Sequence, residues 1–193
     1  MKIVIIKYNA GNVYSVRSAL QRLGVEPFVS DDPGTIQNAD KVIFPGVGEA
    51  STAKNYLDSK GLSDVLIELK QPVLGICLGL QLFCKQSEEN NTIGLNIFDT
   101  EVKKFPETEK VPHMGWNALQ DLKGPLFTDI ADRSYVYFVH SYYAELSKNT
   151  IAKTIYSVPF SAALQKDNFY ALQFHPEKSA KVGEQILKNF MEL

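Results

Sequence analysis

The chain has 193 residues, of which 45% are hydrophobic and 22% charged, and its formal net charge is −2. This length is typical of one compact domain, here residues 1–193, and the small net charge does not favour binding to nucleic acid or to an anionic membrane. No apolar run reaches the roughly 18 residues of a membrane-spanning helix, and the N-terminal apolar stretch is too short for a signal peptide.

Apolar runs alternate with helical patterns in the first half of the chain. Runs typical of buried strands occupy residues 1–7, 26–30, 41–44 and 71–76. Helical spacing of apolar side chains occupies residues 13–23, 51–69 and 78–86. Gly24 is expected to end the first helix and Gly61 to interrupt the second. This order predicts an α/β domain on a parallel sheet.

The second half of the chain has a different pattern. Strand-like segments joined by polar turns occupy residues 97–105, 116–122, 134–146, 149–157, 160–167 and 168–175. A closing helix is expected over residues 182–193. Consecutive strands without intervening helices predict an antiparallel or mixed portion added to the parallel sheet.

The two cysteines of the chain, Cys77 and Cys84, are not expected to form a disulfide. On a helix they would be separated by about 10 Å of rise, whereas a disulfide needs Cα atoms within about 7 Å. Unpaired cysteines favour a reducing compartment, so a cytoplasmic location is expected. Cys84 is interpreted as a buried residue on the apolar side of its helix.

Cys77 lies in the sequence Gly75-Ile76-Cys77-Leu78-Gly79, at the junction of a predicted strand and a predicted helix. A sharp strand-to-helix turn presents its central side chain, and flanking glycines relieve the crowding. The free N–H groups and positive end of a helix favour thiolate, the reactive form of cysteine, and the Leu78 N–H could stabilise an oxyanion. The alternative is a small buried residue at a tight turn.

A cysteine nucleophile needs a base, and His175 is the best candidate among His113, His140 and His175. Pro176 disfavours a helical conformation for His175, and residues two apart in an extended segment point to the same side. Glu177 could therefore orient the His175 ring, as in a catalytic triad. The alternative for this segment is a surface turn.

The other two histidines suggest structural roles. His140, in an aromatic-rich run, is interpreted as a core or pocket-wall residue, and His113 as a loop residue. Metal-ligand spacing is missing from the sequence, so neither a metal nor a cofactor is expected. The glycine-rich turn at residues 45–48 is a weak dinucleotide motif. If its strand lies beside residues 71–76, it could complete an oxyanion hole next to Cys77.

Together these segments resemble the class I, triad-type glutamine amidotransferases. The resemblance rests on PGVG, GICLGLQL and QFHPEKS, in that order. KYNAGN, HMGWN and YFVHSYY narrow it to the glutaminase subunits of imidazole glycerol phosphate synthase in histidine biosynthesis. The resemblance implies an α/β fold with an open, mainly parallel sheet flanked by helices, and it covers residues 3–193.

The resemblance also implies roles for individual residues. The triad would be Cys77 as nucleophile, His175 as base and acid, and Glu177 as orienting group. The oxyanion hole would be formed by Val47, Gly48 and Leu78. The substrate-binding residues would be Gln81, Glu89, His140, Ser141 and Tyr142. The residues near a partner interface would be Asn12, Trp116, Tyr137 and Lys178, although composition alone leaves Trp116 and Tyr137 open as core residues.

The implied activity is hydrolysis of glutamine through a glutamyl thioester, with the ammonia delivered to a (β/α)8-barrel cyclase in a heterodimer. The alternatives are a related amidotransferase for surface-sugar or other amination, and a non-catalytic subunit, which would lack an intact triad. One departure from the family lies at residues 7–12, where Lys7-Tyr8-Asn9-Ala10-Gly11-Asn12 replaces Asp-Tyr-Gly-x-Gly-Asn. The acidic residue has become basic and one glycine is lost.

Overall fold

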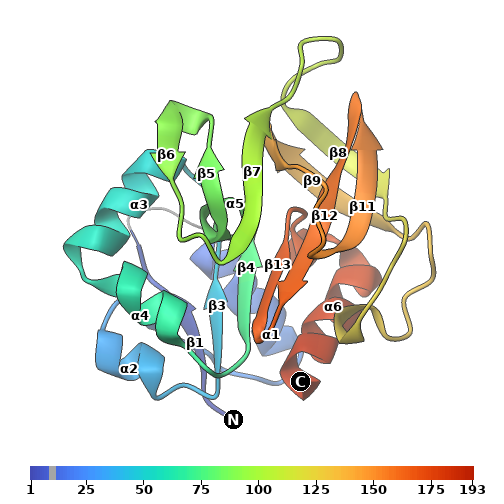
Figure 1. Ribbon diagram of the computed structural model, residues 1–193. Helices are drawn as coiled ribbons and strands as arrows, with labels where there is room; N and C mark the ends of the chain where they lie inside the picture. The colour runs from blue at the N-terminus through green and yellow to red at the C-terminus, as the bar shows by residue number, and fades with distance from the viewer. Residues whose placement is uncertain (9–11) are drawn as a thin grey trace.

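A large mixed sheet forms the centre of the molecule in the computed structural model, which describes residues 1–8 and 12–193 (Figure 1). Its strand order is β11-β12-β13-β4-β3-β1-β2. These strands are β1 (Ile3–Ile6), β2 (Phe28–Ser30), β3 (Lys41–Phe44), β4 (Val73–Ile76), β11 (Thr150–Tyr156), β12 (Val158–Lys166) and β13 (Phe169–Leu172). The pairs from β13 to β2 are parallel, and β11-β12 and β12-β13 are antiparallel. The open, mainly parallel sheet is confirmed.

Helices cover both faces of this sheet. They are α1 (Val13–Arg22), α2 (Pro33–Gln37), α3 (Ala50–Ser59), α4 (Leu62–Glu68), α5 (Leu78–Phe83) and α6 (Ala180–Glu192). Because successive strand residues face opposite sides, Ile3 and Ile5 pack in the core that includes α1 and α6, and Val4 and Ile6 pack in the core that includes α3 and α4. Burial on both faces explains why these strands are almost entirely apolar.

The helical pattern over residues 51–69 forms two helices. Gly61 has φ of 66° and ψ of 16°, a left-handed conformation between α3 and α4. Glycine adopts this conformation at little cost, so the predicted interruption is confirmed. The short helix α2 has no counterpart in the predicted elements. Asp32 caps it by accepting a 2.7 Å hydrogen bond from the Thr35 N–H.

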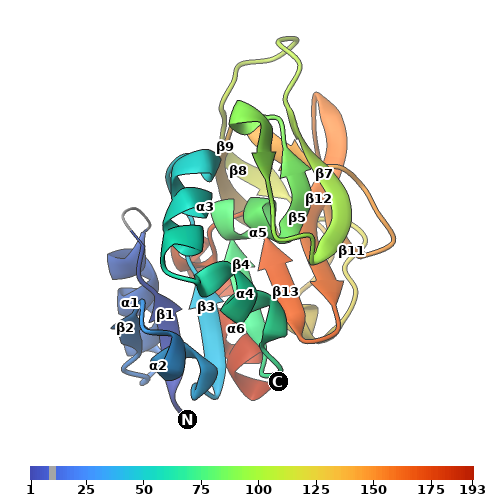
Figure 2. The same ribbon diagram turned by 60° about the vertical axis from the view of Figure 1, so that its left-hand side comes forward.

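Two smaller sheets follow α5 in the chain, which confirms the predicted antiparallel or mixed portion. One is a mixed sheet with the order β10-β7-β5-β6, and the other pairs β8 with β9 in antiparallel fashion. Their strands are β5 (Cys84–Ser87), β6 (Thr92–Ile93), β7 (Phe98–Lys104), β8 (His113–Ala118), β9 (Tyr135–His140) and β10 (Tyr142–Ala144). Short 3-10 turns are η1 (Glu89–Asn91), η2 (Pro125–Phe127) and η3 (Pro176–Lys178). Figure 2 shows β5 and β7 beyond the end of the parallel sheet where α5 begins.

Several predicted elements differ in the structure. The strand expected over residues 134–146 divides into β9 and β10, and the strand expected over residues 116–122 ends at Ala118. The helix predicted over residues 78–86 ends at Phe83, and Cys84 begins strand β5, so its placement on a helix was wrong. Cys84 is buried and is a free cysteine, as is Cys77. His113 was interpreted as a loop residue, but it is the buried first residue of β8. None of the helices in the described part of the chain is long and apolar enough to cross a membrane.

Candidate active site

Cys77 occupies a strained turn between β4 and α5. Its φ of 52° and ψ of −100° lie outside the usual regions for a residue with a side chain. Gly75 and Gly79 make this turn possible, because a Cβ atom on Gly75 would lie 2.9 Å from the backbone carbon of Gly79. Strain of this kind persists only where the surrounding structure enforces it. The glycines flanking Cys77 therefore allow the backbone to turn sharply, as the sequence predicts.

The turn after β3 packs directly against the Cys77 turn. Strands β3 and β4 are parallel neighbours, so residues 45–48 lie at the same end of the sheet as Cys77. A Cβ atom on Gly46 would lie 2.0 Å from the Ile76 carbonyl oxygen and 2.4 Å from the Leu78 nitrogen. Only glycine fits this contact. The predicted proximity of Val47 and Gly48 to Cys77 is therefore present in the fold.

Tyr8 holds the same turn from the other side. Its hydroxyl lies 2.9 Å from the Pro45 carbonyl oxygen and 3.1 Å from the Val47 carbonyl oxygen, and it accepts a 3.3 Å hydrogen bond from the Val47 N–H. Burial raises the pKa of Tyr8, so the hydroxyl keeps its proton and can donate. In this conformation the Val47 N–H is directed to Tyr8, whereas Leu78 begins helix α5 with a backbone N–H that needs no helical partner.

His175 and Glu177 form a buried pair close to Cys77. His175 follows β13, which pairs with β4 in parallel, and Nδ1 of His175 lies 2.8 Å from Oε1 of Glu177. The same oxygen accepts a 2.9 Å hydrogen bond from the Asn12 side-chain amide. Glu177 lies in the 3-10 turn η3 and not in an extended segment. The predicted conformation of Glu177 was therefore wrong, although the predicted contact with His175 is made.

The charge of His175 is controlled by its two neighbours. Burial alone lowers the pKa of His175, but the Cys77 side chain and the Glu177 carboxylate outweigh burial and raise it. Nε2 of His175 is buried and has no hydrogen-bond partner among the described residues. An imidazole whose Nε2 is unused and lies close to the Cys77 sulfur is suited to proton exchange with that sulfur.

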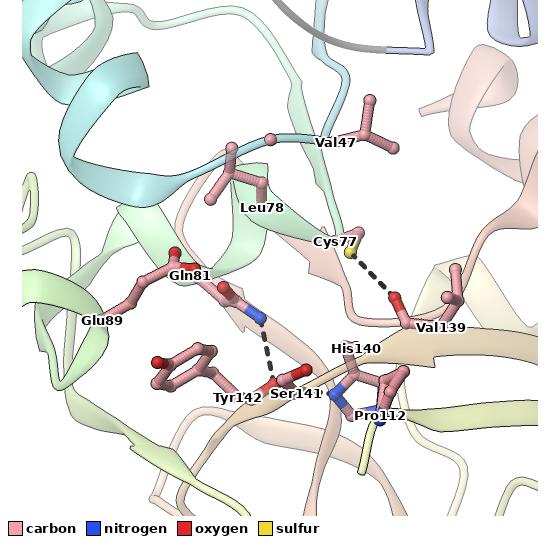
Figure 3. A pocket seen from close by; sticks show the side chains of 11 residues that line it. Val47, Cys77, Leu78, Gln81, Glu89, Pro112, Val139, His140, Ser141 and Tyr142 are labelled. Carbon is pink, nitrogen blue, oxygen red and sulfur yellow. Dashed lines mark hydrogen bonds between the residues drawn. The ribbon is translucent and has the colours of Figure 1, made fainter.

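A cavity of about 340 Å³ opens in front of Cys77 (Figure 3). This volume is within the range of small-molecule sites. The residues that line it are Val47, Gly48, Cys77, Leu78, Gln81, Glu89, Pro112, Val139, His140, Ser141 and Tyr142. Every residue predicted for the oxyanion hole or for substrate binding is thus on this wall.

Polar groups in the cavity come from both sides. Gln81 donates a 3.0 Å hydrogen bond to the Tyr142 carbonyl. One oxygen of Glu89 accepts a 2.8 Å hydrogen bond from the Ala50 N–H at the start of α3. Burial raises the pKa of Glu89, and the Ala50 N–H offsets part of this effect. The cavity therefore combines a thiol, a carboxyl group and backbone carbonyls within reach of a small polar molecule.

The comparisons with known proteins identify the family. A family model described as glutamine amidotransferase class-I matches residues 4–193. The chain belongs to the class I glutamine amidotransferases. This amidotransferase is 58% identical to imidazole glycerol phosphate synthase subunit HisH of Bacteroides fragilis and 54% identical to that of Bacteroides thetaiotaomicron, over 100% of each chain. A solved structure described as a glutamine amidotransferase matches with a TM-score of 0.77 at 18% identity, covering 98% of this chain and 97% of the other, which shows the shared fold.

Sequence reasoning missed two residues of this amidotransferase site, Gln173 and Tyr8. Gln173 is fully buried, and its amide nitrogen lies 3.6 Å from the Cys77 sulfur. Its side-chain oxygen accepts a 3.2 Å hydrogen bond from Gln81. The available signal was a polar residue in the apolar run before His175, two positions away on the same side of an extended segment.

The residues predicted near a partner interface lie together at one edge of the amidotransferase. Trp116 of β8 and Tyr137 of β9 are cross-strand partners with ring centroids 6.1 Å apart, and Trp116 is 53% exposed. Nζ of Lys178 lies 5.9 Å from the Tyr137 ring centroid. Exposure answers the open question for Trp116: it is not a core residue.

The same edge of the amidotransferase contacts the candidate triad. Asn12 hydrogen-bonds Glu177, and the Tyr137 carbonyl accepts a 2.9 Å hydrogen bond from the His175 N–H. Of the two departures within residues 7–12, Asn9 lies outside the described residues. Lys7 is exposed at the end of β1.

Proposed function

We propose that this chain is the glutaminase subunit of imidazole glycerol phosphate synthase, formed by one domain over residues 1–193. The observation that carries the proposal is the buried His175–Glu177 pair next to Cys77, which itself lines the cavity, in a chain whose full-length relatives are HisH subunits. Cys77 is the nucleophile, His175 exchanges the protons and Glu177 orients His175. A reducing cytoplasm suits the two free cysteines.

The first chemical step is attack of the Cys77 thiolate on the side-chain amide carbon of glutamine. The carbonyl electron pair moves to oxygen. The Leu78 N–H stabilises the oxyanion together with the Gly48 N–H of the turn at Val47 and Gly48, because the Val47 N–H is directed to Tyr8. As the tetrahedral intermediate collapses, the carbon–nitrogen bond breaks and His175 donates a proton to the departing ammonia. The raised pKa of His175 supports this role, because the proton is already on the ring before the amine leaves.

The second step is hydrolysis of the glutamyl thioester by water. His175, now neutral, removes a proton from the water that attacks the thioester carbonyl. The sulfur–carbon bond breaks, glutamate is released, and the proton returns to the thiolate–imidazole pair. Glu177 stabilises the imidazolium in both steps, and the 2.8 Å contact with Nδ1 leaves Nε2 as the nitrogen that exchanges protons.

Glutamine is bound by the remaining residues of the cavity. The Glu89 carboxylate binds the substrate ammonium group, and Gln81, His140, Ser141 and Tyr142 line the same cavity. One oxygen of Glu89 is used by the Ala50 N–H, so the other is the available acceptor. No further ionic group is needed for hydrolysis, and the mechanism uses neither a metal nor a cofactor.

The ammonia passes to a (β/α)8-barrel cyclase in a heterodimer. There it reacts with a phosphoribulosyl-formimino-carboxamide ribonucleotide to give imidazole glycerol phosphate and an aminoimidazole carboxamide ribonucleotide. The partner docks on the edge formed by Asn12, Trp116, Tyr137 and Lys178, which contacts the triad through Asn12 and Tyr137. The full-length identity to HisH subunits favours this acceptor over the surface-sugar alternative.

The test is turnover by the complex of this chain with the cyclase and its nucleotide. Cys77→Ala should abolish glutamate formation from glutamine, while synthesis driven by added ammonia should continue. Cys84→Ala is the matched control, because Cys84 is buried away from the cavity and should leave glutamate formation intact. Glutamate formation by the Cys77→Ala complex would contradict the mechanism, and loss of ammonia-driven synthesis would point to a damaged assembly.

A further inference from the structure

Two buried histidines outside the triad form a direct contact beside the glutamine cavity. His113 of β8 and His140 of β9 are cross-strand partners that are 3% and 6% exposed. Nδ1 of His113 lies 3.0 Å from Nε2 of His140. His140 lines the cavity, whereas His113 does not touch it, so the mechanism gives His113 no part.

The proton positions in this pair follow from the groups at its two ends. The amide nitrogen of Asn117 lies 3.3 Å from Nε2 of His113 and can only donate. The carbonyl oxygen of Tyr142 lies 2.7 Å from Nδ1 of His140 and can only accept. The orientation of the Asn117 amide is fixed, because its nitrogen also donates to the Ile155 carbonyl and its oxygen accepts from the Ala118 N–H.

Asn117 at one end and the Tyr142 carbonyl at the other therefore both require histidine rings that carry their proton on Nδ1. His113 accepts at Nε2 and donates from Nδ1 to Nε2 of His140, and His140 donates from Nδ1 to the Tyr142 carbonyl. An added proton on either ring would set one donor against another. Burial lowers the pKa of His113 to about 4 and that of His140 to about 3, which agrees with two neutral rings.

Aromatic packing holds the rings of His113 and His140 in place. The His113 ring stacks between Tyr156 and Phe138, with ring centroids 4.1 Å and 4.9 Å away and interplanar angles of 20° and 26°. His140 packs against Phe105 and Phe160, with centroids 5.1 Å and 5.2 Å away. The direction of the hydrogen bond between the two histidines is therefore built into a rigid core.

The Tyr142 carbonyl, which accepts the hydrogen bond from His140, belongs to a residue that lines the cavity. Ser141 joins β9 of one sheet to β10 of another, and Tyr142 is the first residue of β10. The backbone hydrogen bonds of a single sheet therefore do not continue through this junction. The Tyr142 carbonyl accepts from His140 and from Gln81, whose other partner is Gln173. The hydrogen bond from His140 bridges the junction between β9 and β10. It fixes the Tyr142 carbonyl, which also accepts a hydrogen bond from Gln81.

We propose that His113 is a positioning residue for glutamine binding, which acts through His140 to fix the cavity wall at residues 140–142. The inference rests on the proposed glutaminase function. Because His113 contacts neither Cys77 nor the cavity, its loss should affect the fit of glutamine more than the chemistry at the thiol.

The test compares two variants in the complex with the cyclase and its nucleotide. His113→Phe keeps an aromatic ring between Tyr156 and Phe138 but removes the donor to His140. It should raise the glutamine KM about tenfold, because a buried acceptor is left without its partner, while kcat changes less than threefold. His113→Asn places an amide N–H near the Nδ1 position and should restore most of the KM. Nitrogen-15 NMR of the wild-type chain should show both rings protonated at Nδ1 alone.

An unchanged glutamine KM in His113→Phe would overturn the proposal, as would an equal loss in kcat and kcat/KM. If His113→Phe does not fold, the wild-type NMR spectrum tests the proposal instead. Protonation of His113 at Nε2 would contradict the hydrogen bond that His113 is proposed to donate to His140. Failure of the wild-type complex to hydrolyse glutamine would instead refute the proposed function. The two inferences can therefore fail separately.

Discussion

Gly46→Ala is the substitution that most directly probes how the fold builds the site. The added Cβ would lie 2.0 Å from the Ile76 carbonyl oxygen, 2.4 Å from the Leu78 nitrogen and 2.8 Å from the Gly79 nitrogen. All three contacts are with backbone atoms, which cannot rotate away as a side chain would. An ordinary contact needs about 3.4 Å or more, so the turn at residues 45–48 must move more than about 1 Å from Cys77.

A displacement of this size should be costly for catalysis. Misplacing a catalytic group by about 1 Å can reduce a rate about 100-fold, and removing one oxyanion donor has a similar effect. We therefore expect Gly46→Ala to lower kcat for glutamate formation at least about 100-fold in the complex. Synthesis driven by added ammonia should remain, because the acceptor reaction takes place on the cyclase.

Gly34→Ala is the matched control for this substitution. Gly34 lies in helix α2, and its nearest contact for a Cβ is an ordinary 3.5 Å to the Asp32 side chain. It should leave kcat unchanged, and its stability should change by no more than about 1 kcal/mol. Wild-type kcat in a folded Gly46→Ala complex would refute the close packing of this turn on the Cys77 turn.

Three further predictions concern glutamine binding, partner binding and charge. Glu89→Gln should raise the glutamine KM about 10- to 100-fold and leave kcat unchanged, because it weakens a charged hydrogen bond to the substrate. Steady-state kinetics measures both constants. Trp116→Ala should weaken cyclase binding by at least about 2 kcal/mol if this exposed ring is an interface anchor, as measured by calorimetry. Burial lowers the pKa of His175, but Cys77 and Glu177 raise it to about 10, above the ordinary 6.5, so the protonated ring stabilises the folded state. That stability is complete below pH 6.5 and is lost towards pH 10, so the unfolding free energy of the wild-type chain should fall more steeply over this range than that of Cys77→Ala.

The features that sequence predicted best are those fixed by short-range geometry. The glycines around Cys77 indicated a sharp turn, and the strand before Gly46 indicated a neighbour at the same end of the sheet. Both are present, with Cys77 at a φ of 52° and β3 paired to β4. Membership of the class I glutamine amidotransferases is also confirmed. The turn at Cys77 was determined by adjacent residues, whereas the family was identified from several motifs along the chain.

The errors at Cys84 and His113 came from pairing with other strands, whereas the error at Glu177 came from a local 3-10 turn. Cys84 follows an apolar helical pattern, but residues 84–87 pair with β7 and form a strand instead. Loop-like signals surround His113, from Pro112 to Gly115, yet pairing with β9 buries its ring against Tyr156. Periodicity and turn residues carry no information on such pairings, which explains why the hydrogen-bonded histidines could not be predicted.

The most direct test of the account is covalent labelling of the complex with a glutamine analogue that carries an electrophilic ketone. We expect one stoichiometric adduct on Cys77, located by peptide mass spectrometry. Cys84 should carry no adduct, and glutamine should protect Cys77 from labelling. Absence of the adduct in a complex that makes product from ammonia, or an adduct at another residue, would contradict the assignment of Cys77 as the nucleophile.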